Sequence, residues 1–230
     1  MNEEPNRERN IILVSSDGKI NDIQTAIKMA KPNYIIQVTN GFYRAFTINK
    51  PGITIEAVNG HDNVVVLADK GDAIVVDCQS DNQITIRNLK VAHTVSKSEI
   101  NINRLINIFF KKKKILKSEK SDYHTTLAKD YTRNLTQVCL LRVVKGDVYV
   151  SGCFFSYKIM SKSLETVCPG VVLEKNTKVY LKNCEIIGHR IYQTTGVVNF
   201  KGSLTMEDCK IYCNLNGGVS ILLGRLIRKK

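Results

Sequence analysis

Paired carboxylates are the first residues in this 230-residue chain that could carry out chemistry. Four aspartates fall close together in the chain, namely Asp69, Asp72, Asp77 and Asp81. Two carboxyls held roughly 5 to 9.5 Å apart can hydrolyse a glycosidic bond, one as acid and the other as nucleophile or base. These aspartates and Asp147 stand near predicted turns, however, where aspartate is common for conformational reasons. The sequence alone therefore assigns no catalytic residue.

Cysteine and histidine could instead bind a metal ion. The chain holds seven cysteines and four histidines but no Cys-x-x-Cys pair, and the closest cysteines are Cys209 and Cys213. Structural zinc requires four ligands with finger-like spacing, which this pattern lacks. The odd cysteine count also argues against a disulfide framework. We expect no metal and no cofactor, and we expect the cysteines to serve as small core residues.

Tyrosine and threonine offer a different chemistry, which is contact with a ligand. Tyr149 and Tyr180 each stand between two apolar residues of an alternating segment, and Thr85 and Thr205 hold the same place in two similar segments. If these segments stack side by side, the four residues form one outward column. Exposed tyrosines suit the binding of a protein or a sugar, although strand propensity explains the same residues on a solvated sheet. This column is the candidate binding face.

Four segments align without gaps and define the elements that would position this column: Ile84–Val91, Val148–Phe155, Val179–Ile186 and Leu204–Ile211. In each segment two apolar residues alternate with polar ones, as in a half-buried strand. The next apolar residue then arrives one position late, at Leu89, Cys153, Cys184 or Cys209. The alternation therefore shifts by one residue in every copy.

The residues at the shift are Asn88, Gly152, Asn183 and Asp208, which are types that tolerate a left-handed backbone conformation. Without a change of direction, a shift of one residue would turn the core side chains of the next strand outward. A single left-handed residue makes a sharp corner between two short strands, so the chain can wrap into coils. Four unrelated antiparallel strands would explain the alternation but not the matched shifts.

We predict an all-β fold, a right-handed parallel β-helix (solenoid) with a short N-terminal capping helix. Residues 20–30 carry apolar side chains at helical spacing, Asn21 or Asp22 can cap the start, and Pro32 follows the end. Such a helix would cover the open end of the first coil. A further apolar strand precedes each repeat, at Ala73–Asp77, Val138–Val144, Gly170–Leu173 and Gly196–Phe200.

The chain divides into four parts by composition. These are a polar N-terminal segment (1–19), the capping helix with the first coils (20–93), a basic low-order insert (94–137), and the remaining coils (138–230), whose C-terminal end has no recognisable cap. The start carries no secretory signal, and no apolar run approaches the roughly 18 residues of a membrane span. We therefore expect a cytoplasmic protein.

The net charge of +13 is concentrated in the insert, where residues 94–134 hold ten basic and four acidic side chains, and in the C-terminal tail, which holds Arg225, Arg228, Lys229 and Lys230. Three interpretations of the insert stay open. It is a surface insertion, a translated intron, or an apolar helix followed by a polybasic cluster, Lys111–Lys114, that contacts nucleic acid or an anionic membrane.

Two groups of motifs resemble a known superfamily. Ile23–Ile27, Ile35–Val38, Gly41–Tyr43 and Ile53–Ile55 resemble the opening of the pectin-lyase-like superfamily. Val179–Cys184 and Leu204–Cys209 resemble the right-handed β-helix repeats of carbohydrate-binding proteins and sugar hydrolases. They are also similar to the β-helix region of F-box substrate adaptors and Shc-binding proteins. The resemblance covers residues 20–93 and 138–223 and is specific for the fold rather than for the function.

The resemblance implies where an active site would lie. Enzymes of the superfamily place paired aspartates, an arginine or calcium-binding carboxylates on the outer face of a parallel sheet. The second outward column beside the candidate binding face holds Arg87, Ser151, Lys182 and Glu207. Neither column contains two acids, so no catalytic residue is transferred to this chain.

The sequence favours a non-catalytic binding or scaffold module that presents one face of the β-helix to a protein or a glycan. The resemblance adds substrate recognition in a ubiquitin-ligase-type adaptor as a context. The alternative is a polysaccharide-active enzyme, pectate-lyase-like or glycosidase, or its degenerate relative. A protein is the expected partner and a glycan the second, whereas nucleic acid or an anionic membrane at Lys111–Lys114 has weak support.

Overall fold

The structure is a computed structural model that describes residues 10–95, 138–159, 168–188, 194–214, 218–222 and 224–229. Most of the predicted insert, with the polybasic Lys111–Lys114, lies outside the described residues. Among the described residues, no helix combines the length and the apolar character that crossing a bilayer requires.

Three parallel sheets make up the molecule, and their strands follow one another in a fixed order. Sheet A contains β1 (Ile11–Val14), β2 (Ile35–Val38), β5 (Thr54–Ala57), β8 (Ile84–Arg87), β11 (Asp147–Ser151), β14 (Lys178–Lys182), β17 (Ser203–Glu207) and β20 (Arg225–Lys229). Sheet B contains β3 (Gly41–Arg44), β6 (Val64–Ala68), β9 (Lys90–Val95), β12 (Phe154–Ile159), β15 (Glu185–Ile187) and β18 (Lys210–Tyr212). Sheet C contains β4 (Phe46–Ile48), β7 (Ile74–Asp77), β10 (Leu141–Lys145), β13 (Cys168–Leu173), β16 (Thr194–Phe200) and β19 (Val219–Leu222).

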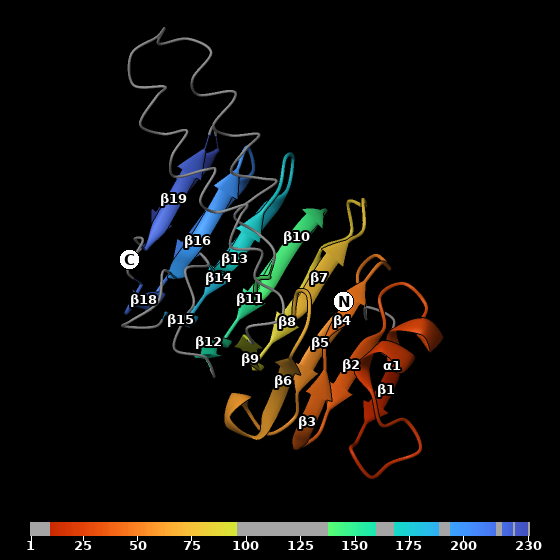
Figure 1. Ribbon diagram of the computed structural model, residues 1–230. Helices are drawn as coiled ribbons and strands as arrows, with labels where there is room; N and C mark the ends of the chain where they lie inside the picture. The colour runs from red at the N-terminus through yellow and green to blue at the C-terminus, as the bar shows by residue number, and fades with distance from the viewer. Residues whose placement is uncertain are drawn as a thin grey trace, which may run out of the picture.

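Each coil passes through sheet A, then sheet B, then sheet C before it returns to sheet A. Strands of consecutive coils therefore lie side by side, as the run from β4 to β19 shows (Figure 1). A short 3-10 helix, η1 (His61–Asn63), leads into β6. The prediction of a right-handed parallel β-helix is confirmed.

The corner between sheets A and B is made by one residue with a positive φ. The angle is 54° at Asn88, 60° at Gly152, 50° at Asn183 and 50° at Asp208. A β-carbon at Gly152 would lie 2.3 Å from Oδ1 of Asn88, so a larger residue at the second corner would displace the Asn88 side chain. The one-residue shift in the sequence is thus a change of strand direction, as predicted.

Replacing Asn183 with alanine is expected to lower the free energy of unfolding by about 1–2 kcal/mol, because alanine disfavours the left-handed conformation. Asn183 is exposed, so the loss of packing is small. Asn183→Gly is the matched control, since glycine adopts this conformation freely. Urea unfolding measures both variants. An alanine variant as stable as the glycine variant would contradict the role given to the bend.

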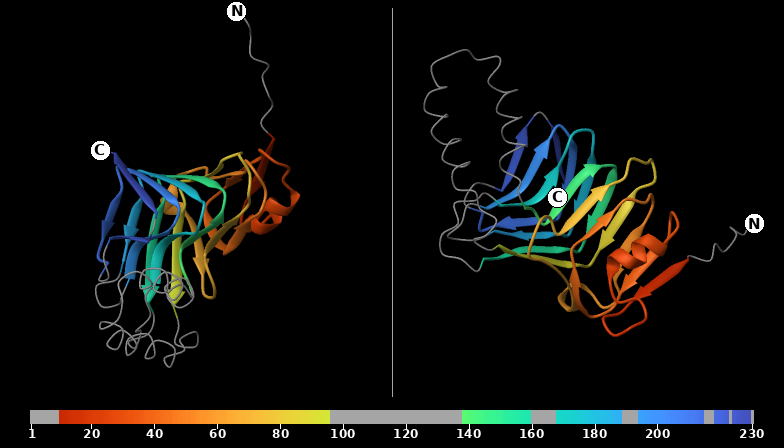
Figure 2. Two further views of the ribbon diagram at one scale, coloured as in Figure 1. Left: turned by 90° about the horizontal axis from the view of Figure 1, so that it is seen from above. Right: turned by 45° about the vertical axis from the view of Figure 1, so that its right-hand side comes forward.

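The capping helix α1 (Ile23–Met29) lies at the N-terminal end of the solenoid and contacts β1, β2 and β4 (Figure 2). Asp22 is its N-cap, because the backbone N–H of Thr25 donates to Oδ1 of Asp22 at 2.9 Å. The helix buries Ile23, Ala26 and Ile27 against the first coil. The predicted helix and its cap are confirmed.

One strand was not expected from the sequence pattern. β1 extends sheet A into residues 1–19, which composition presents as a polar segment. Only Val14 is fully buried in β1, whereas Ile11 and Leu13 are 52% and 55% exposed. Ile12 and Val14 face inward, but all four residues of β1 are apolar, so the sequence shows no alternation of apolar and polar residues at this strand.

The core is a column of aliphatic side chains enclosed by the three sheets. Isoleucine, valine and leucine dominate it, with Phe155 as its largest fully buried side chain. Cys153 and Cys184 are buried in the core at equivalent places in consecutive coils, and Cys209 packs partly buried against it. The prediction that cysteines serve as core residues holds for these positions.

Candidate functional site

An ion-pair cluster occupies the outward face of sheet C. Arg142 lies in β10 between Leu141 and Val143, which are both fully buried, so its side chain leaves the strand on the opposite side. The strand register places Arg142 beside Val75 of β7 and Val172 of β13. The arginine therefore stands on the middle strands of a parallel sheet.

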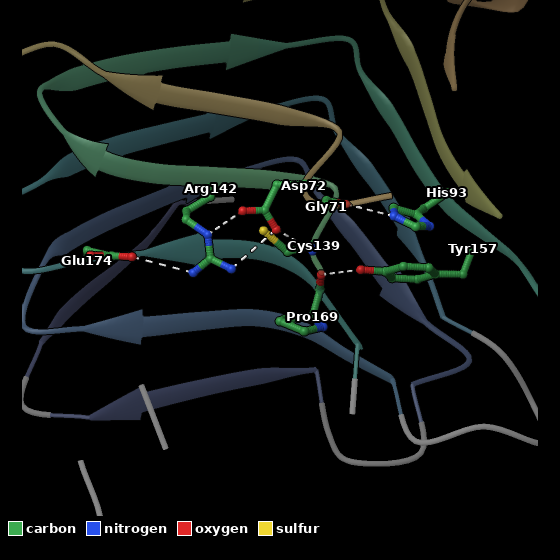
Figure 3. A network of polar contacts seen from close by, with 8 residues as sticks. All are labelled: Gly71, Asp72, His93, Cys139, Arg142, Tyr157, Pro169 and Glu174. Carbon is green, nitrogen blue, oxygen red and sulfur yellow. Dashed lines mark hydrogen bonds and ion pairs between the residues drawn. The ribbon is translucent and has the colours of Figure 1, made fainter. Parts of the chain in front are cut away.

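Two carboxylates hold the guanidinium group of Arg142 (Figure 3). Its Nε donates to Oδ2 of Asp72 at 2.5 Å, and Nη2 donates to Oδ1 of the same carboxylate at 3.2 Å. Its Nη1 donates to Oε1 of Glu174 at 3.4 Å. Asp72 precedes β7 and Glu174 follows β13, so the cluster joins three consecutive coils.

Buried groups fix Asp72 in place. The backbone N–H of Cys139 donates to Oδ1 of Asp72 at 2.7 Å. Next to Asp72, the carbonyl of Gly71 accepts a hydrogen bond from Nε2 of His93 at 2.8 Å. The ring of His93 lies 6.2 Å from the ring of Tyr157, whose hydroxyl donates to a carbonyl of β13 at 2.6 Å. A layer of buried polar side chains therefore supports the ion-pair cluster.

Burial and charge both shift pKa values in this cluster. Burial works against the positive charge of Arg142, but its negative neighbours, Asp72 and Glu174 among them, outweigh burial and raise the pKa of the guanidinium group. Burial raises the pKa of the Cys139 thiol, and the charge of Asp72 raises it further. Burial also raises the pKa of Tyr157 well above its ordinary value. The cluster therefore holds a fixed cation beside neutral Cys139 and Tyr157.

Solvent reaches the three charged groups unequally. The side chains of Arg142 and Asp72 are 12% and 14% exposed, whereas that of Glu174 is 39% exposed. An accessible carboxylate can take a proton from water, and a fixed guanidinium can stabilise negative charge that develops nearby. Asp72 already accepts hydrogen bonds from Arg142 and Cys139, so it serves to orient the guanidinium group.

The predicted binding face lies on sheet A rather than on sheet C. The register pairs Thr85 with Tyr149, Tyr149 with Tyr180, and Tyr180 with Thr205. All four side chains are half-buried between inward-facing neighbours. The structure brings the four residues together in one column, and their use in binding stays a prediction.

The two tyrosines of this column pack against each other. The ring centroids of Tyr149 and Tyr180 are 5.4 Å apart, with 30° between the planes. The hydroxyl of Tyr180 donates to Glu207, and this hydrogen bond raises the pKa of Tyr180. The ammonium of Lys182 lies 2.5 Å from the Glu207 carboxylate and lowers the pKa of Glu207. Lys229 lies over the ring of Tyr180 at 5.7 Å.

The other candidate acids do not gather into a site. Asp69 and Asp81 lie exposed in the bends that flank β7, and Asp77 pairs with Lys145 at 3.4 Å. Asp147 begins β11 and pairs with Lys178 at 3.1 Å. Asp72 alone among the aspartates that the sequence singled out enters the cluster on sheet C.

Metal binding has no support in the part of the chain that the structure describes. There, no three His, Cys, Asp or Glu side chains converge as a metal site requires. The described network is built from ion pairs and hydrogen bonds instead.

This chain is similar to solved structures of pectin methylesterases. No protein-family model matches the chain, and no curated protein matches its sequence. A pectin methylesterase from Aspergillus niger superposes with a TM-score of 0.53 at 12% identity, over 99% of this chain and 77% of that one. Pectin methylesterases from Erwinia chrysanthemi and carrot superpose with TM-scores of 0.47 and 0.46, at 16% and 14% identity, over 89% and 85% of this chain.

The Aspergillus niger structure and this chain share the right-handed parallel β-helix fold. The chain spans 56% of the length of the Erwinia chrysanthemi protein and 63% of that from carrot. The similarity to F-box substrate adaptors and Shc-binding proteins stays a prediction.

Arg142 and Glu174 are the site residues that the sequence analysis missed. The outward columns of the repeat segments lie on sheet A, whereas Arg142 lies in β10 and Glu174 directly follows β13, both on sheet C. Arg142 interrupts the apolar segment Val138–Val144, and Glu174 directly follows the apolar segment Gly170–Leu173. A charged residue within a buried strand was the signal available in the sequence.

Proposed function

We propose that this chain acts on an acidic polysaccharide at the partly exposed end of the ion-pair cluster on sheet C, where Glu174 lies beside Arg142. The observation that carries the proposal is the partly exposed carboxylate of Glu174 beside the Arg142 guanidinium group, which Asp72 holds in place. The polysaccharide-active alternative is thereby preferred over a purely non-catalytic module.

Ester hydrolysis is the reaction class that these groups suit best. Glu174 accepts a proton from water as the water attacks an ester carbonyl, which is general base catalysis. The bond from the carbonyl carbon to the methoxy oxygen then breaks, and Glu174 returns the proton to the methoxide, which leaves as methanol. Arg142 stabilises the negative charge that develops on the carbonyl oxygen. Asp72 orients the guanidinium group and does not contact the substrate. The fold of the Aspergillus niger protein, which is named a pectin methylesterase, supports this class over cleavage of the glycosidic bond.

Methanol release from highly methyl-esterified polygalacturonate tests the proposal, with reducing-end release from pectate and alginate measured in parallel. We expect methanol release from the intact chain and a decrease in kcat/KM of roughly 100-fold or more in Glu174→Gln, because the proton acceptor is lost. Arg87→Gln on sheet A is the control and keeps full activity. Depolymerisation without methanol release would assign a different reaction, and no turnover of any substrate would refute the proposal.

A second candidate function is the binding of a protein or glycan along sheet A. The Tyr149–Tyr180 pair favours it, because stacked aromatic rings on an outward face provide rigid contact area. The same assay separates the two faces. Replacing both tyrosines with alanine raises KM if sheet A holds the polysaccharide, and leaves KM unchanged if it does not. The ubiquitin-ligase adaptor context and the cytoplasmic location stay predictions.

A further inference from the structure

Cys153, Cys184 and Cys209 stack in consecutive coils along the solenoid, and this stack is called the file. Cys153, Cys184 and Cys209 each follow the bend residue of their coil, at the corner between sheets A and B. The pairs on either side of Cys184 and Cys209 are in register, Lys182 with Glu207 before them and Glu185 with Lys210 after them. The two cysteines therefore face each other across neighbouring coils.

Their spacing suits a disulfide. Strands of neighbouring coils lie about 4.8 Å apart, and the Cα atoms of a disulfide lie about 4.4–6.8 Å apart. The sulfur of Cys209 reaches toward the preceding coil, where it contacts the carbonyl of Leu181 at 3.4 Å. The sulfur of Cys184 contacts the carbonyl of Val150, one coil earlier, at 3.6 Å. Both thiols thus point along the file rather than away from it.

The thiols of the file differ in exposure and acidity. Cys153 and Cys184 are 1% and 2% exposed, whereas Cys209 is half-buried at the end of the file. A hydrogen bond from Cys184 lowers the pKa of Cys209 to about 7, and the same bond, together with burial, raises the pKa of Cys184. Cys209 is therefore the accessible nucleophile, and Cys184 is its shielded neighbour.

We propose that Cys209 is a thiol-modification site for low-molecular-weight disulfides, and that Cys184 converts the adduct into a disulfide between coils. The Cys209 thiolate attacks one sulfur of the reagent disulfide, a mixed disulfide forms at Cys209, and one reagent thiolate leaves. Cys184 then loses its proton to solvent and attacks the Cys209 sulfur. The Cys184–Cys209 bond forms and the second reagent thiolate leaves, so the protein is oxidised by two electrons and the reagent is reduced.

The proposal revises the expectation that all the cysteines are inert core residues. Cys153 remains inert, because its sulfur is enclosed in the core and burial raises its pKa to about 12. The site is independent of the cluster on sheet C, since it lies at a different corner of the coil.

Oxidised glutathione added to the folded full chain, followed by non-reducing peptide mapping, tests the proposal. We expect a Cys184–Cys209 cross-link in the wild type, a stable glutathione adduct at Cys209 in Cys184→Ser, and no adduct at Cys184 in Cys209→Ser. Cys153→Ser is the matched control and keeps the cross-link. An adduct that forms first at Cys213, or a Cys184→Ser variant that leaves Cys209 unmodified, would refute the site.

The pH dependence gives a second measurement that does not require the cross-link. Between pH 6 and pH 8 the rate of adduct formation at Cys209 should level off in the wild type, because a thiol with a pKa of about 7 is mostly ionised by pH 8. In Cys184→Ala the rate should still be rising at pH 8, because the variant lacks the hydrogen bond that favours the Cys209 thiolate. At pH 7 the wild type is expected to react several-fold faster than this variant. Equal rates would contradict the activation of Cys209 by Cys184.

Discussion

Replacing Arg142 with methionine is expected to lower the free energy of unfolding by about 3–5 kcal/mol, because it leaves a mostly buried carboxylate without its cation. Asp72 is 14% exposed and receives two of its hydrogen bonds from this arginine. Methionine keeps much of the side-chain volume, so the loss reports charge and hydrogen bonding rather than a cavity. Urea unfolding followed by circular dichroism measures the change.

Two further variants separate the ion pair from the packing around it. Glu174→Gln should cost no more than about 1 kcal/mol, because the carboxylate is partly exposed and the contact is long. The double variant Asp72→Asn, Arg142→Met should recover part of the loss, since no buried charge then lacks a partner. An Arg142→Met variant as stable as the wild type would mean that the cluster does not join the three coils in solution.

Replacing Phe155 with alanine is expected to cost a similar amount, about 3–5 kcal/mol, because a large side chain leaves a close-packed core. Phe155 is fully buried in β12, between Val91 of the preceding coil and Ile186 of the next. The coils on both sides would border the cavity. Thermal and urea unfolding of the variant measure the loss.

The adjacent residue provides a matched control. Phe154 points to the other side of β12, where its ring lies 5.2 Å from the ammonium of Lys90. Phe154→Ala should cost about 1 kcal/mol, since a cation–π contact with Lys90, a stacked contact with the ring of His61 and some surface packing are lost. Equal losses at the two positions would show that the alternation after Gly152 does not set which side chain is buried.

The repeat made most of the fold predictable from the sequence. At Asn183 the chain needs a residue that tolerates a positive φ, and the apolar pattern shifts at the same position, so two independent signals mark one corner. The capping helix was equally predictable, because the N-cap residue Asp22 and the helical spacing of the apolar residues from Ile23 onward both mark where the helix begins. Local chemistry and fold point the same way at these positions.

The candidate site was less predictable because its partners are distant in the chain. Asp72 and Arg142 are 70 residues apart, and Arg142 and Glu174 are 32 residues apart. No local pattern reports such a contact, and it emerges only when the strands of sheet C stack in register. Asp72 alone looks like an ordinary turn residue, and Arg142 alone looks like an exception within an apolar run.

The stacking of coils also determines how the molecule would come apart. Each strand of the described chain pairs only with the corresponding strands of the coils before and after it, so cohesion passes along the axis from neighbour to neighbour, as in a one-dimensional lattice. A terminal coil has one such neighbour and an inner coil has two. Unfolding would therefore begin at a terminal coil and proceed inward, one coil at a time. The ion-pair cluster at Arg142 links three consecutive coils, so those coils would have to separate together.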